Sequence, residues 1–496
     1  MSYHLLSYII LFLPLVAVIY HYVPKKFRWT VLLTAGYLFF YMISQILLIY
    51  LLIATMVTYF TGRWIGTISD NQVHSAKEQT KIKRRILALG IVINGSVLVA
   101  FKYLGIFGIH PIAPIGISYY TLQTISYMTD VYRGVIKPEK NFAKIALYLS
   151  FFPQIMEGPI SRFKETADSL YAGEDIKYDN LIMGYQRILW GLFKKMIIAD
   201  RLASVVSKVF NGYEKFGGAA IMIGVICFTF QLYTEFSGCM DIVLGSGRIF
   251  GIKLPENFRQ PFFADSASDF WHRWHITLGT WFKDYIFYPV SLSKPVKQIG
   301  KKFKNLFGRQ VGKFVAPSIV LFCVWTLNGL WHGAKTTYLF YGLYYFTLIF
   351  IENITEEPIK KLMEKLHIDR KSCWYRGFKI IKLFIIVNIG EMFFRADSIQ
   401  AGFTMLRKMV FHFHSSIYLL SDLGIHTDDF CIAVLGLLMV LVVDILHEKN
   451  ISVQEWINTL RLPFRWGIWY AAILLVIIFG AYGAGYTVTD MIYASY

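Results

Sequence analysis

The chain has 496 residues, of which 55% are hydrophobic, 17% aromatic and 17% charged. This composition excludes an ordinary soluble domain and is typical of an integral membrane protein. The net charge of +18 does not indicate a nucleic-acid partner, because the basic residues cluster beside apolar runs, where they suit the head groups of membrane lipid.

Apolar runs follow one another along the chain and predict membrane-spanning helices. They are Leu5–Tyr20, Trp29–Phe60, Ile86–Phe101, Ala219–Leu232, Val315–Leu327, Leu339–Ile351, Ile380–Ile389, Cys431–Ile445 and Trp469–Tyr482. Because a helix needs about 20 residues to cross the hydrocarbon core, we expect about 9–12 spans, several of them short or interrupted by Gly and Pro. The first run lacks the basic flank and the A-x-A cleavage site of a signal peptide, so we interpret it as a retained span.

Three basic clusters predict how the chain is oriented in the membrane. They lie at Pro24–Trp29, Lys81–Arg85 and Lys294–Phe314, and the positive-inside rule places them in the cytoplasm. The N-terminus is then outside, a first span leads to Lys25, and a helical hairpin returns the chain to Arg63.

Two segments, 109–162 and 234–289, are too polar and too rich in Gly and Pro for ordinary spans. Irregular backbone at membrane depth persists only where protein buries it or where it lines a wet cavity. We interpret the second segment as a wall of short helices around an internal cavity. Interfacial packing of its aromatic residues is the alternative.

His332 is a candidate for proton transfer, because it ends an apolar run beside Trp331 and Gly333. Histidine can take a proton from a hydroxyl near neutral pH, and small neighbours let a substrate approach. A buried histidine with a purely structural role is the alternative.

His272 and His275 are three residues apart, so in a helix both would lie on one face. An aromatic belt with polar tips is the plain interpretation. With His332 they would supply three nitrogens to a metal, but the spacing is not that of H-E-x-x-H, and we expect no metal site. Neither a phosphate-binding loop nor a nucleophile elbow occurs in the sequence.

Five stretches between Leu149 and Asp397 occur in the order found in the membrane-bound O-acyltransferase family. They are "SFFPQIMEGPISRFKE", "FSGCMDIVLGSGRIFGIKLPENFRQPF", "DFWHRWHITLGTWFKDYIFYP", "NGLWHGA" and "FFRAD". The chain resembles in particular the bacterial alginate O-acetyltransferase branch of that family.

The resemblance implies an all-α, polytopic membrane fold. About 11 transmembrane helices, with short re-entrant or interfacial helices, would surround a central tunnel. The whole chain, 1–496, would be one transmembrane domain, with N-terminal spans in 1–145, a catalytic core with the tunnel in 146–400, and C-terminal spans in 401–496.

The resemblance also implies roles for single residues. His332 matches the catalytic histidine of the family and His275 its supporting histidine, whereas no role comes to His272. Residues expected to line the tunnel or bind substrate are Trp331, Trp274, Asn328, Asp241 and Asn257.

The activity that the resemblance implies is transfer of an acyl group, expected to be acetyl, from a cytoplasmic thioester for O-acetylation of an extracellular or cell-surface polysaccharide. The donor would be acetyl-CoA or an acyl carrier protein thioester, with no bound cofactor. The expected partner is a secreted or membrane-anchored SGNH-type acetyltransferase, and the expected location is the bacterial plasma membrane. The alternatives are the D-alanyl transferase of teichoic acid D-alanylation and, from another class, a lipid-linked glycan flippase or transporter.

Three residues depart from the family pattern. Glu157 stands where the family has an apolar or small residue, and Lys335 and Thr336 replace the usual Ser-Trp pair after "NGLWHGA". These departures bear on which donor or acceptor the protein prefers.

Overall fold

The computed structural model describes residues 2–5, 7–70, 75–414 and 422–482, and regular structure in these ranges is almost entirely helical. The β-structure of the described residues is a single bridge between Phe258 and Trp274. The prediction of an all-α chain is therefore confirmed.

The helices of the first half are α1 (Leu13–Tyr22), α2 (Arg28–Ser44), α3 (Leu48–Asp70), α4 (Ala76–Tyr103), α5 (Ile117–Arg133), α6 (Phe142–Ser150), α7 (Phe163–Ala172), α8 (Tyr178–Leu192), α9 (Asp200–Gly212) and α10 (Gly218–Ile249). Those of the second half are α11 (Ala267–Arg273), α12 (Ile276–Phe282), α13 (Tyr288–Leu292), α14 (Lys294–His332), α15 (Thr336–Lys365), α16 (Cys373–Arg395), α17 (Ile399–Phe411), α19 (Thr427–Glu448), α20 (Val453–Thr459) and α21 (Leu462–Phe479). Three π-helical segments, Ser7–Phe12, Phe193–Ala199 and Lys283–Phe287, precede α1, join α8 to α9 and join α12 to α13.

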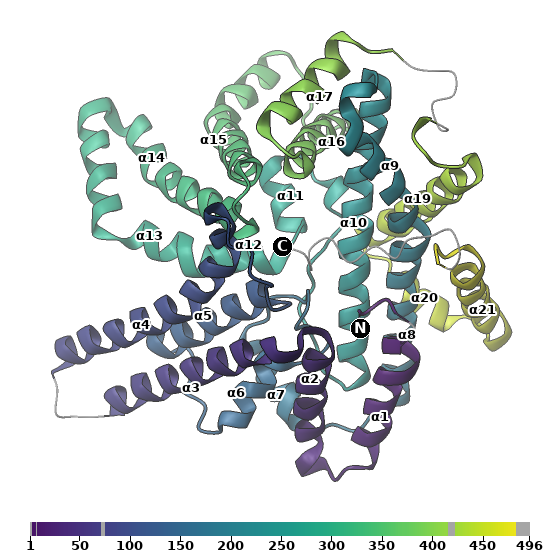
Figure 1. Ribbon diagram of the computed structural model, residues 1–496. Coiled ribbons are helices and arrows are strands. Elements are labelled where there is room, and N and C mark those ends of the chain that lie inside the picture. The colour runs from purple at the N-terminus through teal and green to yellow at the C-terminus, as the bar shows by residue number, and fades with distance from the viewer. Residues whose placement is uncertain (1, 6, 71–74, 415–421, 483–496) are drawn as a thin grey trace.

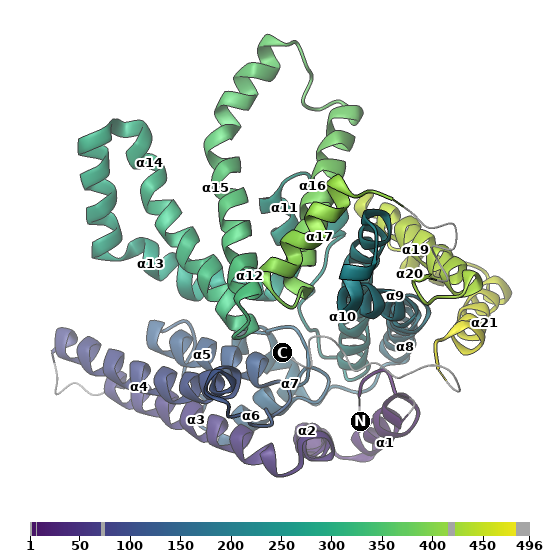
Figure 2. The ribbon, with the colours of Figure 1, turned by 45° about the horizontal axis from the view of Figure 1, so that its top comes forward.

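Helix α10 occupies the centre of the molecule. It packs along α8, α9, α16 and α17, while α2–α7 lie to one side and α19–α21 to the other (Figure 1). The second view shows the same order, with α14 and α15 extending away from the N-terminal helices (Figure 2). Helix α10 thus contacts helices from both halves of the chain.

Six helical stretches in the described part of the chain are long and apolar enough to cross a membrane. They are Lys25–Asp70, Ala76–Phe107, Gly218–Ile249, Gly312–His332, Thr427–Glu448 and Leu462–Phe479, and a shorter apolar helix covers Ser7–Tyr22. All seven coincide with predicted apolar runs. In the first of them the chain turns at Gln45, whose φ is 45°, and this turn divides the run into α2 and α3.

The expectation of short helices throughout 234–289 is wrong for its first part. Residues 234–249 continue α10 as one helix of 32 residues. The polar residues that made a span seem improbable are buried within the protein: Thr234, Glu235, Ser237, Asp241 and Ser246. Beyond Ile249 the chain forms only short helices, as expected.

The irregular segment 151–162 is buried at every residue, and several of its polar groups are bonded within the protein. The Tyr3 hydroxyl donates to the Phe152 carbonyl at 2.8 Å and accepts from the Met156 N–H at 3.1 Å. The Tyr148 hydroxyl donates to the Ser161 carbonyl at 2.8 Å. Such bonds permit irregular backbone away from water. Of the two settings expected for irregular chain, burial in protein is the one found here.

Glycines allow α8 and α10 to touch along their backbones. A Cβ on Gly184 would lie 2.7 Å from the Gly245 carbonyl oxygen, and one on Gly191 would meet the carbonyl oxygen of Gly238. Because backbone cannot yield as a flexible side chain does, each contact requires glycine.

We predict that Gly191→Val lowers the free energy of unfolding by about 1–3 kcal/mol, since the added side chain overpacks the contact with α10. The matched control is Gly95→Val on α4, where a Cβ would have no heavy atom within 4 Å. Thermal unfolding in detergent, followed by tryptophan fluorescence, would compare the two. Equal midpoints for both variants would contradict close packing of α8 on α10.

Candidate functional site

His332 lies at the C-terminal end of α14 and is 5% exposed. Its ring centroid is 4.9 Å from that of Trp331, 5.0 Å from that of Phe394 and 6.0 Å from that of Tyr338. Gly333 ends the helix with φ 147° and ψ −168°, a conformation that side chains rarely adopt. The glycine beside the histidine is therefore required by the turn into α15.

His275 lies in a break between α11 and α12, where its φ is 46°. The interpretation that His272 and His275 share one helical face is therefore wrong, because α11 ends at Arg273 and the chain turns before His275. His272 is exposed, with its Nδ1 2.7 Å from the Ser268 carbonyl, whereas His275 is 2% exposed. Only His275 is turned into the protein.

Asn257 holds the segment that carries His275. Its side-chain Oδ1 lies 3.4 Å from Nδ1 of His275 and accepts from the N–H and the hydroxyl of Thr277 at 3.0 and 2.8 Å. Its backbone carbonyl accepts from the N–H of Ile276 at 3.0 Å. These bonds fix the position of the imidazole relative to α10, since the ring of His275 also packs 4.9 Å from that of Phe236.

Trp331 brings the two histidines together. Its ring lies 4.9 Å from His332 and 6.2 Å from His275, and Tyr119 of α5 packs on it at 6.0 Å. The Lys102 ammonium of α4 lies 5.5 Å from the same ring and donates to the His332 carbonyl at 3.4 Å. The structure thus joins three predicted site residues, Trp331, His275 and His332, in one cluster.

Two further groups surround His332. Asn328 lies one helical turn earlier on α14, and its Oδ1 has no hydrogen-bond partner among the described residues. Tyr341 of α15, 6.4 Å from the His332 ring, donates to the buried carboxyl of Glu391 at 2.8 Å. Sequence reasoning missed Lys102 and Glu391, although a charged residue just beyond an apolar run was a signal for both.

Trp274 and Asp241 have other partners. The Trp274 ring stacks 5.5 Å from Phe270 and packs 5.0 Å from Phe258. Asp241 on α10 forms ion pairs of 3.0 Å with Arg187 and 2.5 Å with Lys194, in the lining of a cavity of about 610 Å³ between α8, α10 and α19–α21.

Several charged side chains are buried within the protein. Lys195 is bonded to Asp200 at 2.8 Å and to Glu235 at 3.1 Å, and Arg201 is bonded to Asp429 at 3.0 Å. Each of these charges has an opposite charge beside it. A buried charge is stable in a protein only when an opposite charge or a hydrogen bond compensates it. These ion pairs are therefore explained by folding alone and do not favour a transporter over an enzyme.

A second cavity, of about 840 Å³, lies between α4, α5 and the segment from α12 to α13. Its charged lining comprises Arg84, Arg133, Arg162, Lys164, Asp130, Glu165 and Asp284. Trp281 also lines it and packs in the same buried apolar cluster as Trp331 and Tyr119. The cavity therefore reaches the packing around the two histidines, and we call it the basic cavity.

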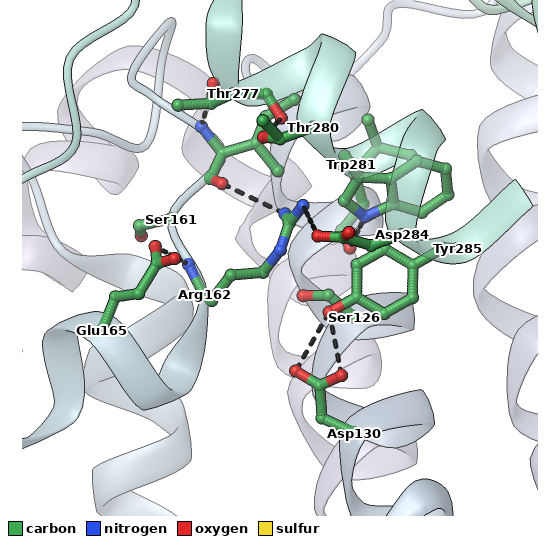
Figure 3. Close-up of polar contacts among 12 residues, drawn as sticks. Ser126, Asp130, Ser161, Arg162, Glu165, Thr277, Thr280, Trp281, Asp284 and Tyr285 are labelled. Carbon is green, nitrogen blue, oxygen red and sulfur yellow. Dashed lines mark hydrogen bonds and ion pairs between the residues drawn. The ribbon is translucent and has the colours of Figure 1, made fainter. Parts of the chain in front are cut away.

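Arg162 is the centre of the polar contacts in the basic cavity (Figure 3). Its guanidinium lies 3.5 Å from the Asp284 carboxylate and 4.9 Å from the centre of the Tyr285 ring. Arg133 lies 5.3 Å from the same ring, and the Tyr285 hydroxyl donates to Asp130 at 2.9 Å. Burial raises the pKa of the Tyr285 phenol, so it stays a donor at neutral pH.

Within the described residues, no group of three His, Cys, Asp or Glu side chains is arranged to hold a metal ion. What the site offers instead is two imidazoles, an indole and an amide in a buried cluster, with cations in the adjoining cavity. Such a set can accept a proton and stabilise a developing negative charge.

Comparison with known proteins gives one family. The sequence profile of "MBOAT, membrane-bound O-acyltransferase family" matches residues 134–362. A probable alginate O-acetylase of Azotobacter vinelandii is 31% identical over 434 residues, which are 84% of this chain and 79% of that protein. A peptidoglycan O-acetyltransferase of Helicobacter pylori is 29% identical over 77% of this chain and 73% of its own. A teichoic acid D-alanyltransferase of Bacillus subtilis is 31% identical over 50% of this chain and 60% of its own.

We predict that Asp241→Asn lowers the free energy of unfolding by about 3–5 kcal/mol, because it leaves the buried Lys194 without its carboxylate and Arg187 with Glu256 alone. Glu356→Gln is the control, since Glu356 is 59% exposed in its pair with Arg370 and its loss should cost at most about 1 kcal/mol. Urea unfolding in detergent would measure both. A normally stable Asp241→Asn protein that has lost its activity would instead assign Asp241 to substrate binding.

Proposed function

Because the chain belongs to the membrane-bound O-acyltransferase family, we propose that it takes an acetyl group from a cytoplasmic thioester and passes it across the bacterial plasma membrane for O-acetylation of a cell-surface polysaccharide. The observation that carries the proposal is the cluster of His332, Trp331 and His275 beside the basic cavity. Such a transfer needs a base, a group that stabilises the oxyanion, and a positively charged entrance for an anionic donor.

The proposed membrane fold is a ring of about 11 spans around a central tunnel. Besides the six long apolar stretches, α15 and α16 have 30 and 23 residues and the continuous run from α8 to α9 covers 178–212, so all three are long enough to cross. In this proposal 146–400 is the catalytic core of a single domain, and 1–145 and 401–496 supply the flanking spans.

In the proposed mechanism His332 acts as the general base. Its imidazole accepts the proton of the acceptor hydroxyl while the oxygen attacks the thioester carbonyl. The tetrahedral intermediate then collapses, the C–S bond breaks, and the imidazolium returns the proton to the departing thiolate. Direct transfer and an acyl-histidine intermediate both fit this site.

His275 and Trp331 are proposed to stabilise the oxyanion. Both are buried and near His332, and hydrogen bonds to a developing charge are strongest where water is excluded. Asn328, one turn before His332, is placed to orient either substrate. Asn257 acts indirectly, because its side chain holds His275 in place.

The proposed donor is acetyl-CoA or an acyl carrier protein thioester, with no bound cofactor. Both carry phosphate, and four cations line the described part of the basic cavity. Leu292 of α13 borders this cavity, and the basic first arm of α14 follows it before the chain bends at Gly308. The proposed partner, a secreted or membrane-anchored SGNH-type acetyltransferase, would receive the acetyl group on the outer side.

D-alanylation of teichoic acid is the second candidate, since a D-alanyltransferase is among the relatives. That likeness covers half of this chain, whereas the O-acetylases match over about four-fifths of it. Native membrane vesicles supplied in turn with radiolabelled acetyl-CoA and with a D-alanyl carrier protein would separate the two. Label from only the second donor would overturn acetyl transfer.

We predict that His332→Ala lowers acetyl transfer about 10²–10⁴-fold, the usual effect of losing a general base. His272→Ala is the matched control, because His272 is exposed and lies outside the cluster. Transfer of label from acetyl-CoA to surface polysaccharide would be measured in inside-out vesicles from the native host. A near-normal rate for a correctly folded His332→Ala protein would remove His332 from the mechanism.

We predict that changing Lys301, Lys302 and Lys304 together to Gln raises the donor KM about 3- to 10-fold, as for roughly 1 kcal/mol of exposed charge attraction, with kcat little changed. These residues are exposed on the first arm of α14. The control removes three exposed lysines at the end of α15: Lys360, Lys361 and Lys365. The difference in donor KM between the α14 variant and the wild-type protein should shrink at high salt. If the two proteins have equal donor KM at low salt, the α14 lysines act only in topology and lipid binding.

A further inference from the structure

We propose that Arg162 positions His275 according to whether an anionic donor occupies the basic cavity, through the hydrogen-bonded path Arg162–Ile160–Thr277–Asn257–His275. The inference rests on the proposed function, because it takes the thioester donor to bind in this cavity. Arg162 is here a positioning residue, and His275 is the group that contacts the reacting atoms.

The path is continuous in the structure. The Arg162 guanidinium donates to the Ile160 carbonyl at 3.3 Å, and the N–H of Ile160 donates to the Thr277 hydroxyl at 3.0 Å. That hydroxyl donates to Oδ1 of Asn257 at 2.8 Å, and the same Oδ1 lies 3.4 Å from Nδ1 of His275. Figure 3 shows its first part, with Arg162 on one side of the loop and Thr277 on the other.

Each member of the path is buried, which limits how it can move. Ile160, Thr277, Asn257 and His275 are between 0% and 4% exposed, and Arg162 is 8% exposed. In a close-packed interior a displaced group shifts its neighbours instead of swinging into solvent. A shift of the Ile160 peptide therefore reaches the imidazole through Thr277 and Asn257.

At the Arg162 end of the path, a bound anion could replace Asp284 as the partner of the guanidinium. Asp284 holds Arg162 at 3.5 Å, a long ion pair, and its own side chain is 46% exposed. A guanidinium binds phosphate in two parallel hydrogen bonds, which are stronger and better directed than this contact. A phosphate in the cavity would take the guanidinium from Asp284 and draw it away from the Ile160 carbonyl.

The consequence falls on His275 because the Asn257 side chain is one of the groups that hold its ring, beside Phe236 and Trp331. The backbone of His275 is fixed by the bond from Ile276 to the Asn257 carbonyl and by its place at the start of α12, so a shift of Oδ1 acts on the ring. The donor would thus set the imidazole orientation needed for transfer, and, since coupling is reciprocal, the path would in turn affect donor affinity.

Two matched variants separate this path from ordinary structural support. Thr277→Val keeps the shape of the side chain and breaks the path without touching the cavity charges. Arg133→Gln removes a cation from the same cavity, beside the same Tyr285 ring, and leaves the path intact, because Arg133 donates to the Asp284 carbonyl and not to Ile160. Thr277→Ser restores the hydroxyl and serves as the conservative rescue.

The test is a double-mutant cycle in native vesicles, with kcat and the acetyl-CoA KM measured for each protein. Thr277→Val removes two buried hydrogen bonds, and we expect it to lower kcat about tenfold or more. Thr277→Ser should recover kcat, and Arg133→Gln should raise KM alone. Arg162→Gln should change both constants. Because it acts through the same path, adding it to Thr277→Val should lower kcat no further, whereas Arg133→Gln and Thr277→Val should combine additively.

Additive kcat losses for Arg162→Gln and Thr277→Val would overturn the coupling while leaving acetyl transfer itself established. A wild-type protein that transfers no acetyl group from any thioester would overturn the proposed function, and the coupling with it. Unfolding midpoints for each variant distinguish both results from misfolding. If Thr277→Val misfolds, the same cycle is run with Asn257→Leu, which removes the Oδ1 acceptor and so interrupts the path at the next residue.

Discussion

Backbone and charged groups that are kept from water must find their partners inside the protein, and this constraint governs the molecule. The loop 151–162 satisfies it with hydroxyls from Tyr3 and Tyr148 and with the amide of Gln154. Asn257 satisfies it for the chain between α11 and α12. Both irregular segments are therefore bonded within the protein, where an unbonded loop would be unstable.

Helix α10 gives these segments a common frame. Glycines bring its backbone against that of α8, and Phe236 and Met240 on another side contact His275 and Asn257. The ion pairs of Asp241 and Glu235 join the same helix to α8 and the π-helical segment after it. Because α10 is held on several sides, it is a rigid support for the irregular segments that pack on it.

Much of this architecture was predictable from sequence, because it depends on local composition. Apolar runs located the six long spanning stretches, and the ordered motifs identified His332 and His275. The break at His275 was not predictable, since the spacing of His272 and His275 fits a helix equally well and only the Asn257 contacts decide against it. The length of α10 and the approach of Lys102 to Trp331 also depend on partners distant in the chain, which no local pattern records.

The same bonds that satisfy buried polar groups also connect them. A loop stabilised by solvent could change its partners independently of its neighbours, but here Ile160 has Arg162 on one face and Thr277 on the other. Replacing either partner leaves a buried group unbonded, which costs free energy unless the next residue moves. A site assembled in this way cannot isolate its buried histidines from the cavity beside them. Rigidity and coupling both follow from the requirement that buried polar groups be bonded within the protein, and the membrane imposes that requirement.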